Sequence, residues 1–400
     1  MSDPSLPQPF KIDIPVEEVE RMKQLIAHTR LPDQAPIPGA SWDYGVDLKW
    51  LREMKDAWQH EFDWKDVERE MNAFDHYTVH IESVKLHFIH QRSARPDAIP
   101  LIFCNGWPSS FWEYHPLIES LTNPSAGQPA FHVVIPSLPG FTFSSAPPHK
   151  GWSMEDNARI FDHLMTGVLN YPSYMAQGGD FGGAICLFLG SDAYPACKLL
   201  NVTALPATPP FGALLTLPLF LLPTSWRQWA YGKIYTEAEL ADLARVKQYI
   251  KGGSGYFLEQ ATQPFSIGYA LNDSPVGLLA WIGAKYVELL DPKNLRRATR
   301  YILATVSLYF LTGTFVTSTL PYYENTGTLS KKLCVSKPIG NSQYPYDVTN
   351  VPASWARKQH PGLVFARRHD EGGHFPAYEV PELIANDLRE MAVAHSDLFA

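Results

Sequence analysis

One short stretch restricts the fold of this chain more than any other, because glycines surround an aspartate between an apolar strand and an apolar helix. The stretch reads Gly178-Gly-Asp-Phe-Gly-Gly183, with the strand expected over 174–177 and the helix over 184–189. A strand that turns directly into a helix forces the residue at the turn into strained backbone angles, and its neighbours must be small. The pattern predicts a sharp strand–turn–helix unit with Asp180 at its apex.

The spacing Gly-x-Asp-x-Gly is that of a nucleophile elbow in which a carboxylate replaces the usual serine hydroxyl. The start of the following helix stabilises the charge on Asp180, and we expect the backbone N–H of Phe181 to be an oxyanion donor. A glycine-rich turn whose aspartate only caps the helix is the structural alternative. The context favours the elbow, because Asn105-Gly-Trp-Pro108 follows an earlier strand. There the N–H of Trp107 would be the other oxyanion donor.

A base and an orienting acid are expected downstream. His374 stands in Glu-Gly-Gly-His-Phe after the last predicted strand, and we predict that it activates a water molecule. A lone histidine is more often structural, but a Gly-Gly-His loop downstream of an elbow favours the base. Chain order predicts the acid between nucleophile and histidine, and we assign Asp347 rather than Glu237, which lies deep in a helical segment. Asp370 and Glu371 are too close in sequence to face the imidazole and are predicted to form a solvated loop.

The rest of the chain alternates helices and strands and then ceases to alternate. Two amphipathic helices are expected around 16–26 and 50–62, a hairpin over 77–90, and a helix over 154–164 that Ser153 caps. Further strands are expected at 100–104, 133–136, 199–205, 335–340 and 363–366. This alternation predicts a parallel sheet with helices on both faces. The predicted division is an N-terminal region 1–94, a core over 95–205 and 326–400, and a helical cap inserted at 206–325.

Charge and cysteine content restrict the partners and the compartment. The net charge is −8, and the cationic residues form no runs that could follow phosphates, so nucleic acid is excluded. The four cysteines show no CxxC pair and are predicted to be free thiols in a reducing compartment. Six charged residues within the first twenty argue against a secretory signal, so a cytoplasmic protein is expected.

One uncharged stretch bears on membranes. Nothing between Lys198 and Arg227 is charged, which is long enough to cross a bilayer. Five prolines interrupt the stretch, and they would leave backbone carbonyls unpaired in lipid: Pro206, Pro209, Pro210, Pro218 and Pro223. We expect no transmembrane span, while shallow contact with a membrane surface and a homodimer are both compatible with the sequence.

The motifs resemble those of the microsomal-type epoxide hydrolases, the soluble fungal members in particular, over nearly the whole chain. Asp180 matches the family nucleophile in Gly-Gly-Asp, His374 matches its histidine in Gly-Gly-His-Phe, and Tyr344-Pro-Tyr-Asp347 matches the segment of the relay acid. The resemblance implies an α/β-hydrolase fold with a helical cap inserted in the core and an N-terminal region that wraps both. It implies neither a cofactor nor a metal ion.

Two tyrosines complete the site that the resemblance implies. Tyr256 stands in Ser-Gly-Tyr before a run similar to the family's cap, and Tyr322, preferred to Tyr323, stands in family register. An epoxide oxygen leaves as an alkoxide, which is too basic unless phenol groups protonate it. The implied reaction adds water to an apolar epoxide to give a vicinal diol, through an ester on the aspartate. The aromatic cap and the apolar segment 206–223 indicate a bulky substrate.

Two other functions compete with this interpretation. A haloalkane dehalogenase shares the aspartate nucleophile but needs N–H donors for halide, typically a tryptophan after the nucleophile, where Phe181 stands. A non-catalytic ligand-binding protein of the same fold would be expected to lack a catalytic residue, and all are present. The chain departs from the family at Asn105, where histidine is usual, which alters the hydrogen bonding behind Trp107. The membrane anchor of the mammalian enzymes is not expected.

Overall fold

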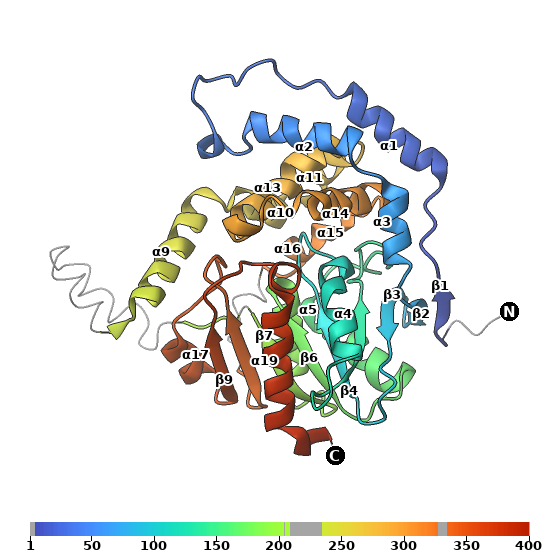
Figure 1. Ribbon diagram of the computed structural model, residues 1–400, viewed down its shortest axis with the longest axis vertical. Coiled ribbons are helices and arrows are strands. Elements are labelled where there is room, and N and C mark those ends of the chain that lie inside the picture. Colours follow the sequence, from blue (N-terminus) through green and yellow to red (C-terminus); the bar gives the residue numbers. More distant parts are fainter. Residues whose placement is uncertain (1–4, 204, 209–233, 327–333, 400) are drawn as a thin grey trace.

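A mixed sheet forms the centre of the molecule (Figure 1). The computed structural model describes residues 5–203, 205–208, 234–326 and 334–399. Within these ranges the sheet has nine strands in the order β1-β2-β3-β5-β4-β6-β7-β8-β9. The strands are β1 (Gln8–Phe10), β2 (His76–Ile81), β3 (Val84–Gln91), β4 (Ile99–Cys104), β5 (Phe131–Pro136), β6 (Tyr174–Gly178), β7 (Cys197–Val202), β8 (Ile339–Gln343) and β9 (Leu363–Arg368).

The sheet is parallel from β5 to β9 and antiparallel at its other end. Strands β1, β2 and β3 pair antiparallel with their neighbours, and β3 also pairs antiparallel with β5. The predicted hairpin is therefore confirmed, and the expectation of a parallel sheet holds for the six strands that follow it. The strand expected at 335–340 begins later, at Ile339, because Pro338 has no N–H to donate to a neighbouring strand. The chain also leaves the sheet after Val202, earlier than expected.

Two of the N-terminal helices, α1 (Val16–His28) and α2 (Leu48–His60), lie over the cap on the side away from the sheet, and the third, α3 (Trp64–Met71), stands beside the cap and leads down to the sheet (Figure 1). Each of the three contacts α14 of the cap. The helix expected around 50–62 ends before Phe62, so this part of the expectation is wrong. The side chain of Asp63 accepts a hydrogen bond from the backbone of Lys65 and starts a new helix there.

Two further groups of helices cover the sheet and form the cap. Those of the core are α4 (His115–Thr122), α5 (Met154–His163), α6 (Asp180–Leu189), α17 (Ala353–Gln359), α18 (Pro376–Glu379) and α19 (Pro381–Ala394). Those of the cap are α9 (Glu237–Gly252), α10 (Gly255–Thr262), α11 (Pro264–Leu271), α12 (Pro275–Leu278), α13 (Ala284–Leu289), α14 (Thr299–Thr312), α15 (Phe315–Ser318) and α16 (Leu320–Glu324). The predicted cap of Ser153 on α5 is confirmed as a capping box with Asp156.

The cap helices all fall between β7 and β8, where the helical insertion is expected. The boundaries 1–94, 95–205, 206–325 and 326–400 stay a prediction, since residues 209–233 and 327–333 lie outside the described ranges. Most of the uncharged stretch up to Arg227 falls there too. Within the described residues, no single helix is long and apolar enough to cross a membrane, and the one pair that would suffice together, 299–312 and 315–324, is bent by 108°. All four cysteines are free thiols.

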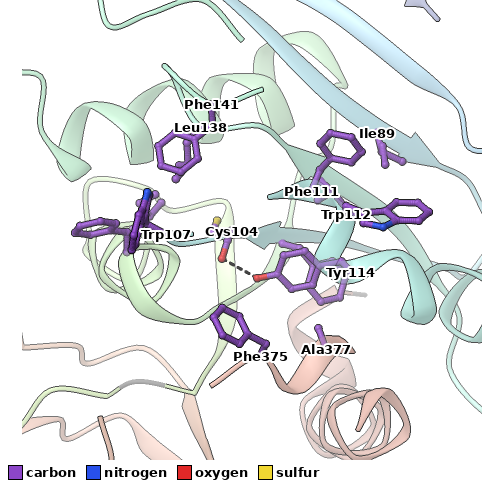
Figure 2. Close-up of a cluster of buried hydrophobic side chains, with 14 of the residues drawn as sticks. Ile89, Cys104, Trp107, Phe111, Trp112, Tyr114, Leu138, Phe141, Phe375 and Ala377 are labelled. Atoms are coloured by element: carbon purple, nitrogen blue, oxygen red, sulfur yellow. Dashed lines mark hydrogen bonds between the residues drawn. The ribbon is translucent and has the colours of Figure 1, made fainter. Parts of the chain in front are cut away.

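Close backbone packing joins the elbow to the neighbouring strand. The first turn of α6 lies directly on the end of β4, so that a Cβ added to Gly182 would stand 1.8 Å from the carbonyl oxygen of Cys104. That carbonyl also accepts a hydrogen bond of 2.9 Å from the Tyr114 hydroxyl, within the aromatic cluster that follows β4 (Figure 2). Glycine is required at position 182 because no side chain fits in that space.

Replacing Gly182 by alanine should therefore destabilise the protein. We expect Gly182→Ala to lower the free energy of unfolding by about 1–3 kcal/mol, because the added methyl group must push the two backbones apart. Urea unfolding followed by tryptophan fluorescence measures the difference. Gly252→Ala is the matched control, since open space surrounds a Cβ at the end of α9. Equal stability of the two variants would contradict the assigned packing.

Candidate active site

The apex of the strand–turn–helix unit has the backbone strain that the sequence predicts. Asp180 follows β6, opens α6 and has a φ of +52°, in the left-handed region that non-glycine residues seldom adopt. The loop after β4 approaches it so closely that a Cβ on Gly106 would lie 2.4 Å from the Asp180 Cβ. The backbone N–H of Trp107 donates a 3.0 Å hydrogen bond to Asp180 Oδ1. The structure thus brings together the predicted nucleophile and one predicted oxyanion donor.

The predicted base and acid meet at the same edge of the sheet. His374 follows β9 and Asp347 follows β8, and the carboxyl ends of these parallel strands lie at the same edge of the sheet as that of β6. His374 Nδ1 lies 2.9 Å from Asp347 Oδ1, and its Nε2 lies 3.6 Å from Asp180 Oδ2. Asp347 is fully buried, whereas Asp370 and Glu371 are exposed, as expected of a solvated loop.

The two carboxylates determine the charge of the imidazole between them. Burial by itself would lower the pKa of His374, but the negative charges of Asp347 and Asp180 outweigh burial and raise this pKa well above its usual value. The raised pKa favours the protonated imidazole, which lies between the carboxyl groups of Asp347 and Asp180. A cationic imidazole has no free lone pair, so it cannot accept a proton until one of these negative charges is removed.

The loop that carries His374 is fixed by a buried carboxylate that the sequence analysis did not select. Glu379 accepts hydrogen bonds from the backbone N–H groups of Gly373 at 2.9 Å and Asp291 at 2.7 Å. The N–H of His374 itself donates to the carbonyl of Leu289 at 2.9 Å. The histidine loop is thereby fastened to the segment that follows α13 of the cap. A glutamate five residues after the histidine was the only signal in the sequence, and without contacts it has no special meaning.

The two predicted tyrosines pack against Trp107, whose backbone N–H binds the nucleophile. Tyr256 stacks on Trp107 with ring centroids 5.3 Å apart, and Tyr322 stands edge-on to Trp107 at 5.7 Å and to Tyr256 at 5.8 Å. Tyr322 is 2% exposed, whereas Tyr323 is 52% exposed. Burial, assisted by the charge of Asp180, raises the pKa of Tyr256 to about 12 and that of Tyr322 well above its usual value. Both phenols are therefore protonated donors at neutral pH.

One of these phenols, Tyr322, interacts with the neighbouring Tyr256 but forms no hydrogen bond of normal geometry among the residues that the structure describes. Its hydroxyl is also buried. A buried donor without a partner is unfavourable by about 1–3 kcal/mol, and this arrangement is typical of a site where a ligand supplies the acceptor. The site thus combines a carboxylate, a nearby imidazole and phenol donors for an oxygen atom.

A buried lysine that the sequence did not predict lies next to the tyrosines. Lys285 of the cap places its Nζ 4.6 Å from the centroid of the Tyr256 ring and forms an ion pair of 2.6 Å with Glu288. A cation over the face of the ring restrains the orientation of Tyr256. No motif surrounds this lysine, so nothing in the sequence distinguished it from a surface residue.

The second predicted oxyanion donor is the backbone N–H of Phe181, and its position is documented only by contacts of the Phe181 ring with other described residues. Phe181 is the second residue of α6, and its ring stands edge-on to Tyr322 at 4.7 Å. The role of its backbone N–H stays a prediction. Across the described ranges, no group of three or more histidine, cysteine, aspartate or glutamate side chains is arranged to hold a metal ion.

Comparisons with known proteins agree with this geometry. The family model "Epoxide hydrolase N terminus" matches residues 7–114, and the model "alpha/beta hydrolase fold" matches residues 99–236. A putative epoxide hydrolase of Stigmatella aurantiaca is 35% identical over 96% of this chain and 84% of its own length. Epoxide hydrolase 1 of Oryctolagus cuniculus is 31% identical over 95% of this chain and 87% of its own.

A solved structure extends the likeness to the fold. The structure of Aspergillus niger epoxide hydrolase superimposes with a TM-score of 0.83 at 35% sequence identity, covering 97% of this chain and 96% of that one. The resemblance found in the sequence and the predicted fold class are thereby confirmed. The chain belongs to the microsomal-type epoxide hydrolases and is an enzyme of the α/β-hydrolase fold.

Proposed function

We propose that this epoxide hydrolase opens an apolar epoxide to a vicinal diol through an alkyl ester on Asp180. The observation that carries the proposal is the carboxylate itself, strained at the elbow between the N–H of Trp107 and the imidazole of His374. A carboxylate in this position attacks a saturated ring carbon and leaves an ordinary ester, which a second step must hydrolyse. A hydroxyl nucleophile would not give such an ester.

In the first step the two tyrosines bind the ring oxygen. Asp180 attacks one ring carbon, the carbon–oxygen bond breaks, and Tyr256 and Tyr322 donate hydrogen bonds to the oxygen as negative charge develops on it. A proton from a phenol converts this oxygen into the first hydroxyl group of the product. The hydroxyl of Tyr322 supports the role, because it is buried and forms no hydrogen bond of normal geometry within the described residues.

In the second step the loss of charge on Asp180 lowers the pKa of His374, so that the imidazole can act as a base. An ester is neutral, so alkylation removes one of the two anions that raise the pKa of His374. The imidazole then gives up a proton more easily and becomes a base with a free Nε2. Asp347, 2.9 Å from Nδ1, holds the ring in the orientation in which Nε2 faces the ester. The N–H groups of Trp107 and Phe181 would stabilise the oxyanion formed when water attacks.

The aromatic surroundings of Asp180 favour a bulky, apolar epoxide. The rings of Trp107, Phe181 and Phe257 surround Tyr322 and offer apolar surface rather than charge. A halide-releasing reaction gains no support, since the pair of phenol donors suits an alkoxide. A cytoplasmic location, shallow membrane contact and a homodimer stay predictions.

The origin of the oxygen in the product tests the covalent ester. With enzyme in excess over an aryl epoxide in ¹⁸O water, the diol of the first turnover should carry unlabelled oxygen that comes from Asp180. Mass spectrometry of the diol, and of the peptide that contains Asp180, measures the label. Full incorporation of ¹⁸O into the first diol would show direct attack by water and refute the ester.

Removing the charge of the orienting acid should separate the two steps. We expect Asp347→Asn to slow ester hydrolysis by roughly 10²–10⁴-fold, the range that general-base catalysis contributes, while ester formation continues. Rapid quenching should therefore detect accumulated alkyl-enzyme. The exposed acids provide controls, and normal turnover of Asp347→Asn combined with a stalled Asp370→Asn or Glu371→Gln would show that the acid is misassigned.

Each tyrosine should contribute to ring opening. Loss of one preorganised donor typically slows a reaction by about 10²–10³-fold, so Tyr256→Phe and Tyr322→Phe should slow ester formation by up to that factor. The double variant should lose nearly all activity, since no acid remains for the alkoxide. Stopped-flow fluorescence measures ester formation. Tyr323→Phe is the control, because this exposed side chain should be silent, and a damaging effect of Tyr323→Phe alone would overturn the choice of Tyr322.

A further inference from the structure

A small pocket lies next to Asp180 and His374, at the ends of the central strands. Its wall includes polar side chains from several segments that are far apart in sequence: Ser109, Glu113, Gln177, Asp180, Thr203 and His374. The cavity has room for about one water molecule. The backbone of the elbow forms part of the same wall through Gly179. A water molecule held there would therefore lie beside the carboxyl group that is proposed to form the ester.

Two acceptors in this wall have no obvious structural purpose. Gln177 of β6 is 1% exposed, and its Oε1 has no hydrogen-bond partner among the described residues. Glu113 is 6% exposed, and the one side-chain hydrogen bond found for it within the described chain is from the Ser109 hydroxyl to Oε2. Oε1 of Glu113 is thus left to accept another hydrogen. Buried acceptors of this kind are normally satisfied by an ordered water molecule.

The position of Glu113 is rigidly fixed. The neighbouring hydroxyl of Tyr114 donates to the carbonyl of Cys104 at 2.9 Å, and in Figure 2 this bond ties the segment after β4 back to the strand. On the other side, the hydroxyl of Tyr309 from the cap donates to the carbonyl of Ser109 at 2.9 Å. Burial raises the pKa of Glu113 to about 7, and the repulsion of Glu379 and Asp180 acts in the same direction, while Ser109 and the His374 cation oppose it. A buried carboxyl group is difficult to explain as packing alone.

We propose that Glu113 is a further catalytic residue, whose carboxyl group binds the water molecule that hydrolyses the ester on Asp180. This role rests on the proposed function and adds to it the residue that supplies the water. In the resting enzyme, the water donates its hydrogens to Glu113 and Gln177, because the cationic His374 has no lone pair to accept one. When the ester forms, His374 gives its proton through solvent to the phenolate that ring opening leaves on the tyrosine, which restores the phenol. Nε2 then becomes an acceptor and the water turns one hydrogen toward it.

The hydrolysis then balances without another reactant. The water oxygen bonds to Cγ of the Asp180 ester while His374 Nε2 takes one water proton and Glu113 accepts a hydrogen bond from the other O–H. The bond between Cγ and the diol oxygen breaks, and His374 returns its proton to that oxygen. The new carboxyl group of Asp180 then gives its remaining proton to His374, which restores the resting ion pair. Glu113 orients the lone pair of the water throughout and is not consumed.

The test compares the two steps in a variant that keeps the shape of Glu113. In Glu113→Gln, Ser109 retains the side-chain oxygen and the cavity faces an amide N–H₂, which cannot accept a hydrogen from water. We expect ester breakdown to slow by roughly ten- to a hundredfold, with the rate of ester formation within about twofold of the wild type. Quenched-flow mass spectrometry of the Asp180 peptide measures both rates. Glu68→Gln is the control, because Glu68 is a buried carboxylate bonded to Ile14 and Trp64, outside the cavity wall.

Two further measurements decide the remaining outcomes. If Glu113→Gln does not fold, Gln177→Met takes its place, and the expected result is again slower ester breakdown with normal ester formation. A high-resolution crystal structure of the wild type should show one ordered water bonded to Glu113 and Gln177. Unchanged ester breakdown in the folded variant, or a crystal structure without this water, overturns the role of Glu113 and leaves the ester mechanism intact. Absence of any Asp180 ester in the wild type refutes the proposed function instead.

Discussion

The close approach of two backbones at the elbow is the constraint on which the site depends. The first turn of α6 can lie on the end of β4 only because Gly182 has no side chain, and this contact places the loop after β4 over Asp180. The same contact directs the N–H of Trp107 at the carboxylate and holds Asp180 at a φ of +52°. The strain of this backbone angle is of the order of 1–3 kcal/mol and persists because the surrounding sheet is rigid.

Parallel strands then bring the remaining groups to one place. Residues that follow β4, β6, β8 and β9 lie at the same edge of the sheet, although they are separated by more than 250 positions in the sequence. Glu379 fastens the loop of His374 to the segment after α13, so that core and cap share one hydrogen-bond network. The cap in turn places Tyr256 and Tyr322 against Trp107. The geometry of the site is thus a consequence of how the cap is attached.

Electrostatics gives the site an order of events. The imidazole lies between two carboxylates, and its pKa is raised while both are charged. An ester on Asp180 would remove one charge and make the imidazole a base at the moment when a base is needed. Burial raises the pKa of Glu113 to about 7, which favours the neutral form of this carboxyl group, whereas the raised pKa of His374 favours the charged form. Glu113 and His374 face the same small cavity, but their pKa shifts favour a neutral acid and a charged base.

The sequence by itself determined the local units, because these depend on neighbours in the chain. The glycines around Asp180 predicted the elbow, the capping box predicted the start of α5, and the alternation from β4 onward predicted the parallel strands. Errors arose where a local signal was weak, as at Phe62, where the cap of Asp63 starts a new helix. The choice of Tyr322 over Tyr323 needed the family register, because adjacent tyrosines have the same chemistry.

Only the tertiary structure shows the surroundings of Glu113, Gln177, Lys285 and Glu379. Each is an ordinary residue in the sequence, and no motif distinguishes any of them. Their properties come from burial and from partners far away in the chain, such as Asp291 for Glu379. Desolvation and hydrogen bonding depend on three-dimensional distance, so they cannot be obtained from the order of residues alone.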